Sequence, residues 1–284
     1  MARMIRWAVC SVVMLVFAPG AYADDFAVLR GSQPTYNWAG FYGGVQGGES
    51  SATVNFNQAT APEISNILRN TAIEADENIS GWSVLSGNGT AHNAGYGGFV
   101  GYNVDWENVI LGLEVNYNRV SLNSSTANGL ERFFTDSADL PANHNYLYDV
   151  KVAASASMHI TDILTFRGRA GWEAGNFLPY AFAGLAIGRA DVSSLTTLSY
   201  TATDYPTPQV PPIAALSPLA FGPESAGTTE GGAFTYGFAT GFGIDIALLP
   251  HVFVRGEGEY IYFVPLDHIQ ASVASARLGV GYKF

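Results

Sequence analysis

The sequence has almost no cysteine and few charged residues. Its one cysteine, Cys10, lies close to the N-terminus of the 284-residue chain, so the remainder can form neither a disulfide framework nor a thiolate metal site. Charged residues make up 13% of the chain, against about 25% in a typical soluble domain. The net charge of −11 argues against binding to nucleic acid, which favours basic patches. After the first segment, no apolar run reaches the roughly 20 residues of a membrane-spanning helix.

The first 23 residues have the pattern of an export signal. Arg3 and Arg6 precede a short apolar run over 7–18, and the small-x-small sequence AYA ends at Ala23. We therefore expect export, cleavage after Ala23, and a short periplasmic lead-in over 24–37.

Glycine and aromatic residues are abundant, with 32 Gly, 17 Phe and 15 Tyr, and they alternate. In 233–248 the even positions are nearly all bulky, while the odd positions are small or polar. This period of two is typical of a strand with one apolar face.

The same alternation recurs along the chain and predicts an all-β, eight-stranded, antiparallel, up-and-down transmembrane β-barrel over 38–284. Long connections, predicted to be extracellular, alternate with short ones, as in outer-membrane barrels. The long connections are 51–92, 123–148 and 192–232, and in the first Ile64, Ile67, Leu68 and Ile73 indicate a short helix. The predicted strands are 38–50, 93–106, 109–122, 149–175, 177–191, 233–248, 251–263 and 270–284.

The segment 149–175 predicts one long strand because bulky residues occupy its even positions almost throughout. Asp162 and Ile163 break the pattern and indicate a local irregularity. On this parity the even residues face outward, and Ser155, Ser157 and His159 face inward.

Eight strands enclose an interior only wide enough for side chains. A soluble barrel of lipocalin type would place its apolar face there, but the many aromatic rings favour the opposite arrangement, with rings toward lipid and small or charged residues inside. The inward charges have both signs, and we expect them to pair and block the lumen, with Arg255 to Glu114 as an example of a bridge. This predicted ionic network comprises Glu114, Arg167, Arg169, Asp245, Arg255, Glu257, Glu259 and Arg277.

Aromatic residues also gather near the predicted strand ends, as expected for rings in the headgroup zone of a bilayer. These residues are Trp38, Tyr42, Trp106, Trp172, Phe177, Tyr180, Tyr282 and Phe284. The last strand, RLGVGYKF, resembles the β-signal read by the bacterial outer-membrane assembly machinery. The matching residues are Arg277, Gly279, Tyr282 and Phe284.

Four stretches resemble the outer-membrane β-barrel surface proteins of alpha-proteobacteria, a family of porin or opacity type. They are WAGFYGGVQGG (38–48), TFRGRAGWEAGNFLPYAFAGLAIG (165–188), GEGEYIYF (256–263) and RLGVGYKF (277–284). The resemblance implies an eight-stranded barrel in the outer membrane of a Gram-negative bacterium, at the cell surface and in contact with lipid and lipopolysaccharide. It does not extend to the long connections, so it names no partner for them.

These observations favour a structural, envelope-integrity or surface-interaction role. A narrow porin for small solutes is the alternative, and a lipid-modifying enzyme comes third. His159 lies near Ser155 and Ser157 in sequence, but no carboxylate is evident to orient its imidazole, as a triad requires. We therefore expect no enzymatic activity and assign no catalytic residue, cofactor or metal site.

Overall fold

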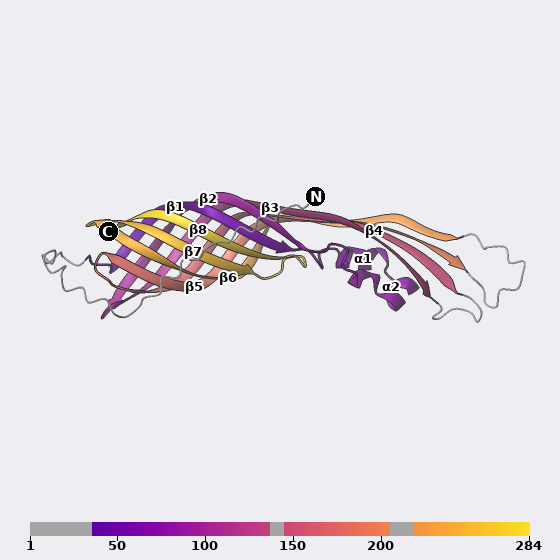
Figure 1. The fold of residues 1–284 in the computed structure, drawn as a ribbon, viewed down its shortest axis with the longest axis horizontal. Helices are drawn as coiled ribbons and strands as arrows, with labels where there is room; N and C mark the ends of the chain where they lie inside the picture. Colours follow the sequence, from indigo (N-terminus) through magenta and orange to yellow (C-terminus); the bar gives the residue numbers. More distant parts are fainter. Residues whose placement is uncertain (1–35, 137–144, 205–217) are drawn as a thin grey trace, which may run out of the picture. The chain divides into compact units, whose positions relative to one another are not determined.

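In the computed structural model, which describes residues 36–136, 145–204 and 218–284, eight antiparallel strands follow one another around a closed ring (Figure 1). The predicted eight-stranded barrel is confirmed. The predicted signal segment and Ala23 lie outside the described residues, as does most of the lead-in. The strands are β1 Gly40–Asn55, β2 Asn88–Trp106, β3 Val109–Asp136, β4 Tyr146–Trp172, β5 Phe177–Asp204, β6 Leu219–Leu249, β7 Val252–Phe263 and β8 Gln270–Lys283.

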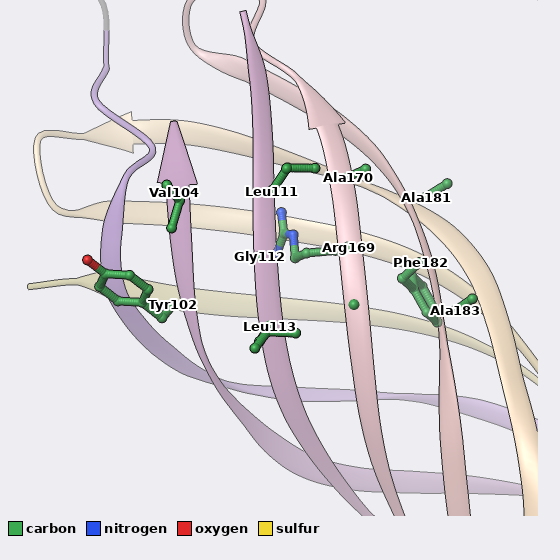
Figure 2. A pocket seen from close by; sticks show the side chains of 11 residues that line it. Tyr102, Val104, Leu111, Gly112, Leu113, Arg169, Ala170, Ala181, Phe182 and Ala183 are labelled. Atoms are coloured by element: carbon green, nitrogen blue, oxygen red, sulfur yellow. The ribbon is translucent and has the colours of Figure 1, made fainter. Parts of the chain in front are cut away.

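The wall of the ring is apolar outside, and its charged side chains lie inside. Leu113 is 74% exposed and Phe238 is 65% exposed, whereas Arg255 is 2% exposed. Small outward residues leave shallow grooves in this surface, one of them about 610 Å³ in volume. Figure 2 shows the side chains of this groove, which include Tyr102, Val104, Leu111, Leu113, Ala170 and Ala181.

Four strands continue beyond the ring and pair with one another, forming what we call the extension. The pairing of β2 with β3 ends at Arg119, and that of β6 with β7 begins at Gly237. The strands β3 and β4, β4 and β5, and β5 and β6 stay paired well past these points. In Figure 1 the extension, formed by β3, β4, β5 and β6, runs away from the ring, with β4 labelled along it.

The predicted long connections 123–148 and 192–232 are therefore wrong over much of their length. The strands β3 to β6 occupy 123–136, 146–148, 192–204 and 219–232. Residues 137–144 and 205–217 lie outside the described part of the chain. The connection predicted over 51–92 is shorter, because β1 continues to Asn55 and β2 begins at Asn88.

The polarity of the two faces reverses where the extension begins. Register shifts fall between Arg119 and Leu122 in β3, between Ile160 and Asp162 in β4, and opposite Asp191 of β5. Each is a β-bulge, in which one strand carries an extra residue. Beyond these bulges the buried residues are mainly apolar and the exposed ones mainly polar.

Because of the bulge in β4, the prediction that the even residues of 149–175 face outward along the whole strand is only partly right. One strand with a local irregularity is confirmed, but the extra residue exchanges the two faces. Even residues such as Phe166 and Trp172 are exposed on the wall, whereas Val150, Val152 and Met158 are buried in the extension. Ser155, Ser157 and His159 therefore do not face inward.

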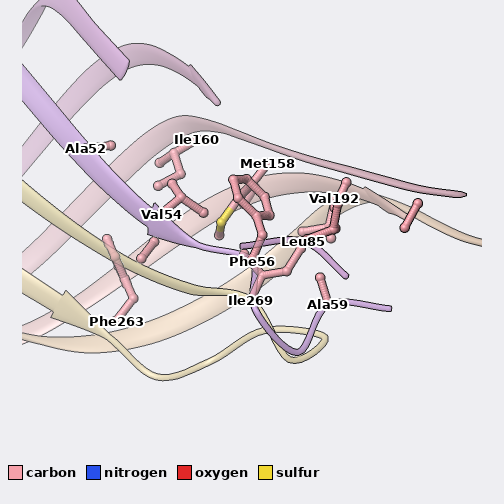
Figure 3. Close-up of a cluster of buried hydrophobic side chains, with 14 of the residues drawn as sticks. Ala52, Val54, Phe56, Ala59, Leu85, Met158, Ile160, Val192, Phe263 and Ile269 are labelled. Atoms are coloured by element: carbon pink, nitrogen blue, oxygen red, sulfur yellow. The ribbon is translucent and has the colours of Figure 1, made fainter. Parts of the chain in front are cut away.

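The β1–β2 connection packs against the inner face of the extension. It forms helices α1 Ala61–Ile67 and α2 Ala72–Glu77 and a 3-10 turn η2 Ile79–Gly81, so the predicted short helix is confirmed as two. No helix among the described residues has the length and apolarity to span a bilayer. Ile64, Leu68 and Ile73 are buried in a core with the extension, and Figure 3 shows the part formed by Val54, Phe56, Leu85, Met158, Ile160, Val192 and Ile269.

Candidate functional site

Eight charged side chains meet inside the ring and form what we call the lumen cluster. Four arginines and four carboxylates balance in charge, and every residue is at most 7% exposed. The structure brings together all eight residues that the sequence analysis placed in an ionic network. They are Glu114 from β3, Arg167 and Arg169 from β4, Asp245 from β6, Arg255, Glu257 and Glu259 from β7, and Arg277 from β8.

Strand register creates the first set of ion pairs. Glu114 lies opposite Arg167, and Arg167 Nη2 is 2.5 Å from Glu114 Oε1. Asp245 lies opposite Arg255, with 2.8 Å between Arg255 Nε and Asp245 Oδ1. Cross-strand pairing of opposite charges favours the observed register over a slipped one.

A second set of ion pairs crosses the lumen between strands that are not neighbours. Arg255 Nη1 is 2.9 Å from Glu114 Oε2, which is the bridge given as the example from sequence. Arg167 Nη2 is 2.6 Å from Glu257 Oε2, and Arg169 Nη2 is 2.7 Å from Asp245 Oδ2. The register of a strand does not determine these contacts, because they depend on the diameter of the ring.

Aromatic side chains that point into the barrel contact the lumen cluster. The guanidinium of Arg169 lies 3.8 Å from the ring centre of Tyr180, and that of Arg255 lies 3.9 Å from the ring centre of Phe99. Tyr42 donates a hydrogen bond of 2.7 Å from its hydroxyl to Glu114. Such cation–π and hydrogen bonds offset part of the cost of removing charges from water.

These interior aromatic side chains correct part of the prediction that the aromatic residues near the strand ends lie at the bilayer surface. Trp38, Tyr42 and Tyr180 were expected at the lipid surface, but they are buried inside the ring. The other five aromatic residues predicted near the strand ends are exposed: Trp106, Trp172, Phe177, Tyr282 and Phe284. Sequence reasoning missed the interior rings because it assigned large aromatic residues to the outer face as a group.

Polar and apolar layers follow one another along the axis of the ring. The inward residues of β3 give their order, from Ile110 through Glu114, Asn116 and Asn118 to Leu122. Ile110 belongs to an apolar cluster with Trp38, Tyr42, Phe99, Leu178 and Phe253. Asn116 and Asn118 accept hydrogen bonds from Gln46 across the lumen, at 2.9 and 2.7 Å. Leu122 belongs to the core shared with the extension.

The residues of the predicted assembly signal lie on both faces of β8. Tyr282 and Phe284 are exposed outside, and Arg277 joins the lumen cluster through Glu257, at 2.7 Å. A Cβ atom at Gly279 would lie 2.9 Å from the carbonyl oxygen of Val45, so the close approach of β1 favours glycine there. Within 36–136, 145–204 and 218–284, no group of three or more His, Cys, Asp or Glu side chains could hold a metal ion.

Comparison with known proteins gives one family and several similar folds. A family model described as "Outer membrane protein beta-barrel domain" matches residues 8–284, and no curated protein matches the sequence. Among solved structures, Ail, the attachment invasion locus protein of Yersinia pestis, is 14% identical, with 86% of this chain and 99% of Ail covered and a TM-score of 0.29.

Two further solved structures are similar to a comparable degree. Neisserial surface protein A is 12% identical, with 87% of this chain and 98% of that chain covered and a TM-score of 0.34. The N-terminal β-barrel domain of Pseudomonas aeruginosa OprF is 13% identical, with 85% and 97% covered and a TM-score of 0.32.

Proposed function

Because the chain belongs to the outer membrane protein β-barrel domain family, we propose that it is a surface protein of the outer membrane with a closed lumen. Its role is then structural, in envelope integrity, or one of surface interaction through the extension. The observation that carries this proposal is the lumen cluster, in which four arginines and four carboxylates pair across the ring.

The closure follows from the layers along the ring. Charged groups that are paired and hydrogen-bonded in a low-dielectric interior are costly to separate. An apolar cluster lies on one side of the lumen cluster, and the packed β1–β2 connection lies on the other. A continuous path for water would need all three layers to open together.

The test of the closed lumen is the conductance of refolded protein in planar bilayers. We expect no steady current through the unmodified chain. The double substitution Arg167→Ala with Glu257→Ala removes one charge of each sign and should produce discrete current steps. A steady conductance of hundreds of picosiemens from the unmodified chain would instead support the alternative, a narrow porin for small solutes.

The surface role is supported by the reversed polarity of the extension. Its core is apolar, and its outward side chains, such as Asn123, Ser125 and Lys151, are polar. This is the pattern of a segment that stands in water, unlike the wall below it. We propose that the extension lies outside the cell, where it meets lipopolysaccharide and a partner that its sequence does not name.

Single-cysteine labelling of whole cells tests this orientation. Cys10 lies in the predicted signal, so the mature chain would carry no competing thiol. A membrane-impermeant maleimide should label Lys151→Cys in the extension but not Asn176→Cys in the β4–β5 turn, which should react only after lysis. Labelling of Asn176→Cys alone in intact cells would reverse the proposed topology.

We also propose that Arg277, Gly279, Tyr282 and Phe284 are read by the outer-membrane assembly machinery, and that the chain is exported after cleavage at Ala23. The four stretches quoted from the sequence further support a place among alpha-proteobacterial surface proteins. Removal of Phe284 should lower the amount of protein in the outer membrane while leaving refolding in detergent unchanged.

A further inference from the structure

Three side chains on the outward surface of β3, β4 and β5 lie in the order nucleophile, base and carboxylate. Ser121 Oγ is 3.0 Å from His159 Nε2. On the other side of the imidazole, His159 Nδ1 is 3.8 Å from Asp191 Oδ2. The second carboxylate oxygen, Asp191 Oδ1, accepts a hydrogen bond of 2.6 Å from the backbone N–H of Gly232. The carboxylate that was not evident in the sequence therefore comes from β5.

The β-bulges assemble this group. Asn123, not Ser121, is the register partner of His159, and Ser121 reaches the imidazole because it lies within the bulge of β3. Asp191 is the direct register partner of His159. Gly232 lies in the bulge of β6 with φ of +67°, a conformation that favours glycine. Bulges commonly redirect side chains beside active sites.

The group lies at the boundary between the apolar wall and the polar extension. A groove of about 600 Å³ that shares Asp191 with this group is lined by Leu164, Ile187 and Phe234, by the guanidinium groups of Arg119 and Arg189, and by Asp162, whose carboxylate accepts a hydrogen bond from Tyr117. Its apolar residues suit an acyl chain, and its guanidinium groups suit phosphate oxygens. A molecule with both features is a phosphate-bearing lipid in the outer leaflet.

We propose that Ser121, His159 and Asp191 form a hydrolytic triad that cleaves an acyl ester of a phosphate-bearing membrane lipid. Arg189 binds the phosphate, and Arg119, two residues before Ser121 on the same face, donates to the oxyanion. Asp191 is a positioning residue that holds the proton of the imidazole on Nδ1, so that Nε2 accepts from Ser121. The distance of 3.8 Å exceeds a hydrogen bond and must shorten on substrate binding, as catalytic contacts in unliganded sites often do.

The reaction proceeds in two steps. Ser121 Oγ bonds to the ester carbonyl carbon while its proton moves to His159 Nε2, and the carbonyl electron pair moves onto oxygen. When the pair returns, the ester C–O bond breaks, and the leaving alkoxide takes the proton from Nε2. Water then attacks the acyl-serine with His159 as base, releasing a fatty acid and restoring the Ser121 hydroxyl. No oxidant or reductant is required.

The test uses the full mature chain, refolded from denaturant and placed in two kinds of vesicle. One contains phosphatidylethanolamine and phosphatidylglycerol, and the other adds lipid A. Mass spectrometry of the released fatty acids identifies the source when the phospholipids carry only oleoyl chains, because saturated and 3-hydroxy acids can then come only from lipid A. A fluorophosphonate probe, which bonds to activated serines, gives a readout independent of lipid turnover.

We expect fatty acid release from at least one vesicle type and probe attachment at Ser121. Ser121→Ala should lose both, with release falling on the order of 10³-fold or more, whereas the outward control Ser125→Ala should keep both. Asp191→Asn should lower kcat and leave KM unchanged, and Asp191→Glu should restore part of the loss. A correctly folded chain that neither labels nor releases fatty acid overturns the proposal, as does release that Ser121→Ala leaves intact. Labelling without release overturns the lipid substrate.

Discussion

Glu114 is the residue on which the lumen cluster depends most. Its carboxylate lies within 3.3 Å of nitrogen atoms from three arginines, Arg167, Arg169 and Arg255, and it accepts a further hydrogen bond from Tyr42. A buried ion pair contributes little net stability compared with an apolar pair of the same shape, but removing one partner leaves the others uncompensated. Loss of the Glu114 carboxylate would therefore destabilise the barrel mainly by leaving buried arginines without a compensating negative charge.

Replacing Glu114 by glutamine should destabilise the barrel by about 3–5 kcal/mol, because it leaves an excess buried positive charge among three arginines. Urea unfolding of the refolded protein in lipid vesicles measures this change. Lys151→Gln is the matched control, because the Lys151 ammonium and its partner Glu131 are exposed and its second partner, Asp149, is partly exposed. This substitution should leave the midpoint unchanged. Equal midpoints for the two variants would contradict the role assigned to Glu114.

At the scale of the element, the strand β3 crosses the boundary between the apolar wall and the polar extension. Its outward residues change from Leu113, Val115 and Tyr117 to Arg119 and Ser121, while its inward residues change from polar to apolar. The same strand thus faces two different surroundings. Arg119 marks the point at which the outward surface ceases to be apolar.

Two arginine substitutions on the outward face of β3 should have opposite consequences. Leu113→Arg places a charge in the lipid-facing wall and should cost about 2–4 kcal/mol. Ala127→Arg places the same charge on the outward face of the extension and should have no measurable effect. Urea unfolding in vesicles compares the two, and equal destabilisation would argue against a lipid-facing wall.

The packing of α1 against the extension makes a separate prediction. Ile64 is fully buried, and Glu63 of the same helix accepts hydrogen bonds from Ser194 of β5 and Thr228 of β6. Ile64→Ala should cost about 2–5 kcal/mol and open the extension locally. Hydrogen exchange should then quicken in α1 and in 192–204 but not in 110–118. The exposed control Ser65→Ala should leave both regions unchanged.

The strands of the wall could be predicted from sequence because most of them alternate between bulky and small residues, as 233–248 does. The extension could not, because much of it is Ser, Thr, Gly and Asn on the outward face, and its hydrogen bonds depend on neighbours far along the chain. In β4 the bulge and the change of surroundings fall together. Val150 and Phe166 are both even and apolar, although one faces the core and the other faces lipid.

A change of polarity within a strand was the available signal for the extension. In β3 the even residues pass from Asn116 and Asn118 to Val120 and Leu122, which marks the point where the inside becomes apolar. The members of the lumen cluster could be predicted because charged residues are scarce and nearly all lie on small-residue faces. The geometry of Ser121, His159 and Asp191 could not, since three bulges determine it.

At the scale of the whole described barrel, one arrangement accounts for these features. The closed part of the barrel holds its charged cluster inside, between aromatic and apolar layers, and presents an apolar outer surface. The extension has an apolar core and a mainly polar outer surface. Both arrangements follow from the rule that apolar surface avoids water. In lipid the apolar face of a strand turns outward, and in water it turns inward. The change from the lipid-facing pattern to the water-facing one falls at three bulges, between Arg119 and Leu122 in β3, between Ile160 and Asp162 in β4, and in β6 opposite Asp191.

The most direct measurement of this claim is the accessibility of spin labels attached along the outward face of β3, in protein reconstituted into vesicles. Labels at Leu113→Cys and Val115→Cys should collide with oxygen, which dissolves in lipid, and not with a water-soluble nickel chelate. Labels at Asn123→Cys and Ala127→Cys should show the reverse, with the change near Arg119. Equal accessibility to the nickel chelate along the whole strand would contradict the account.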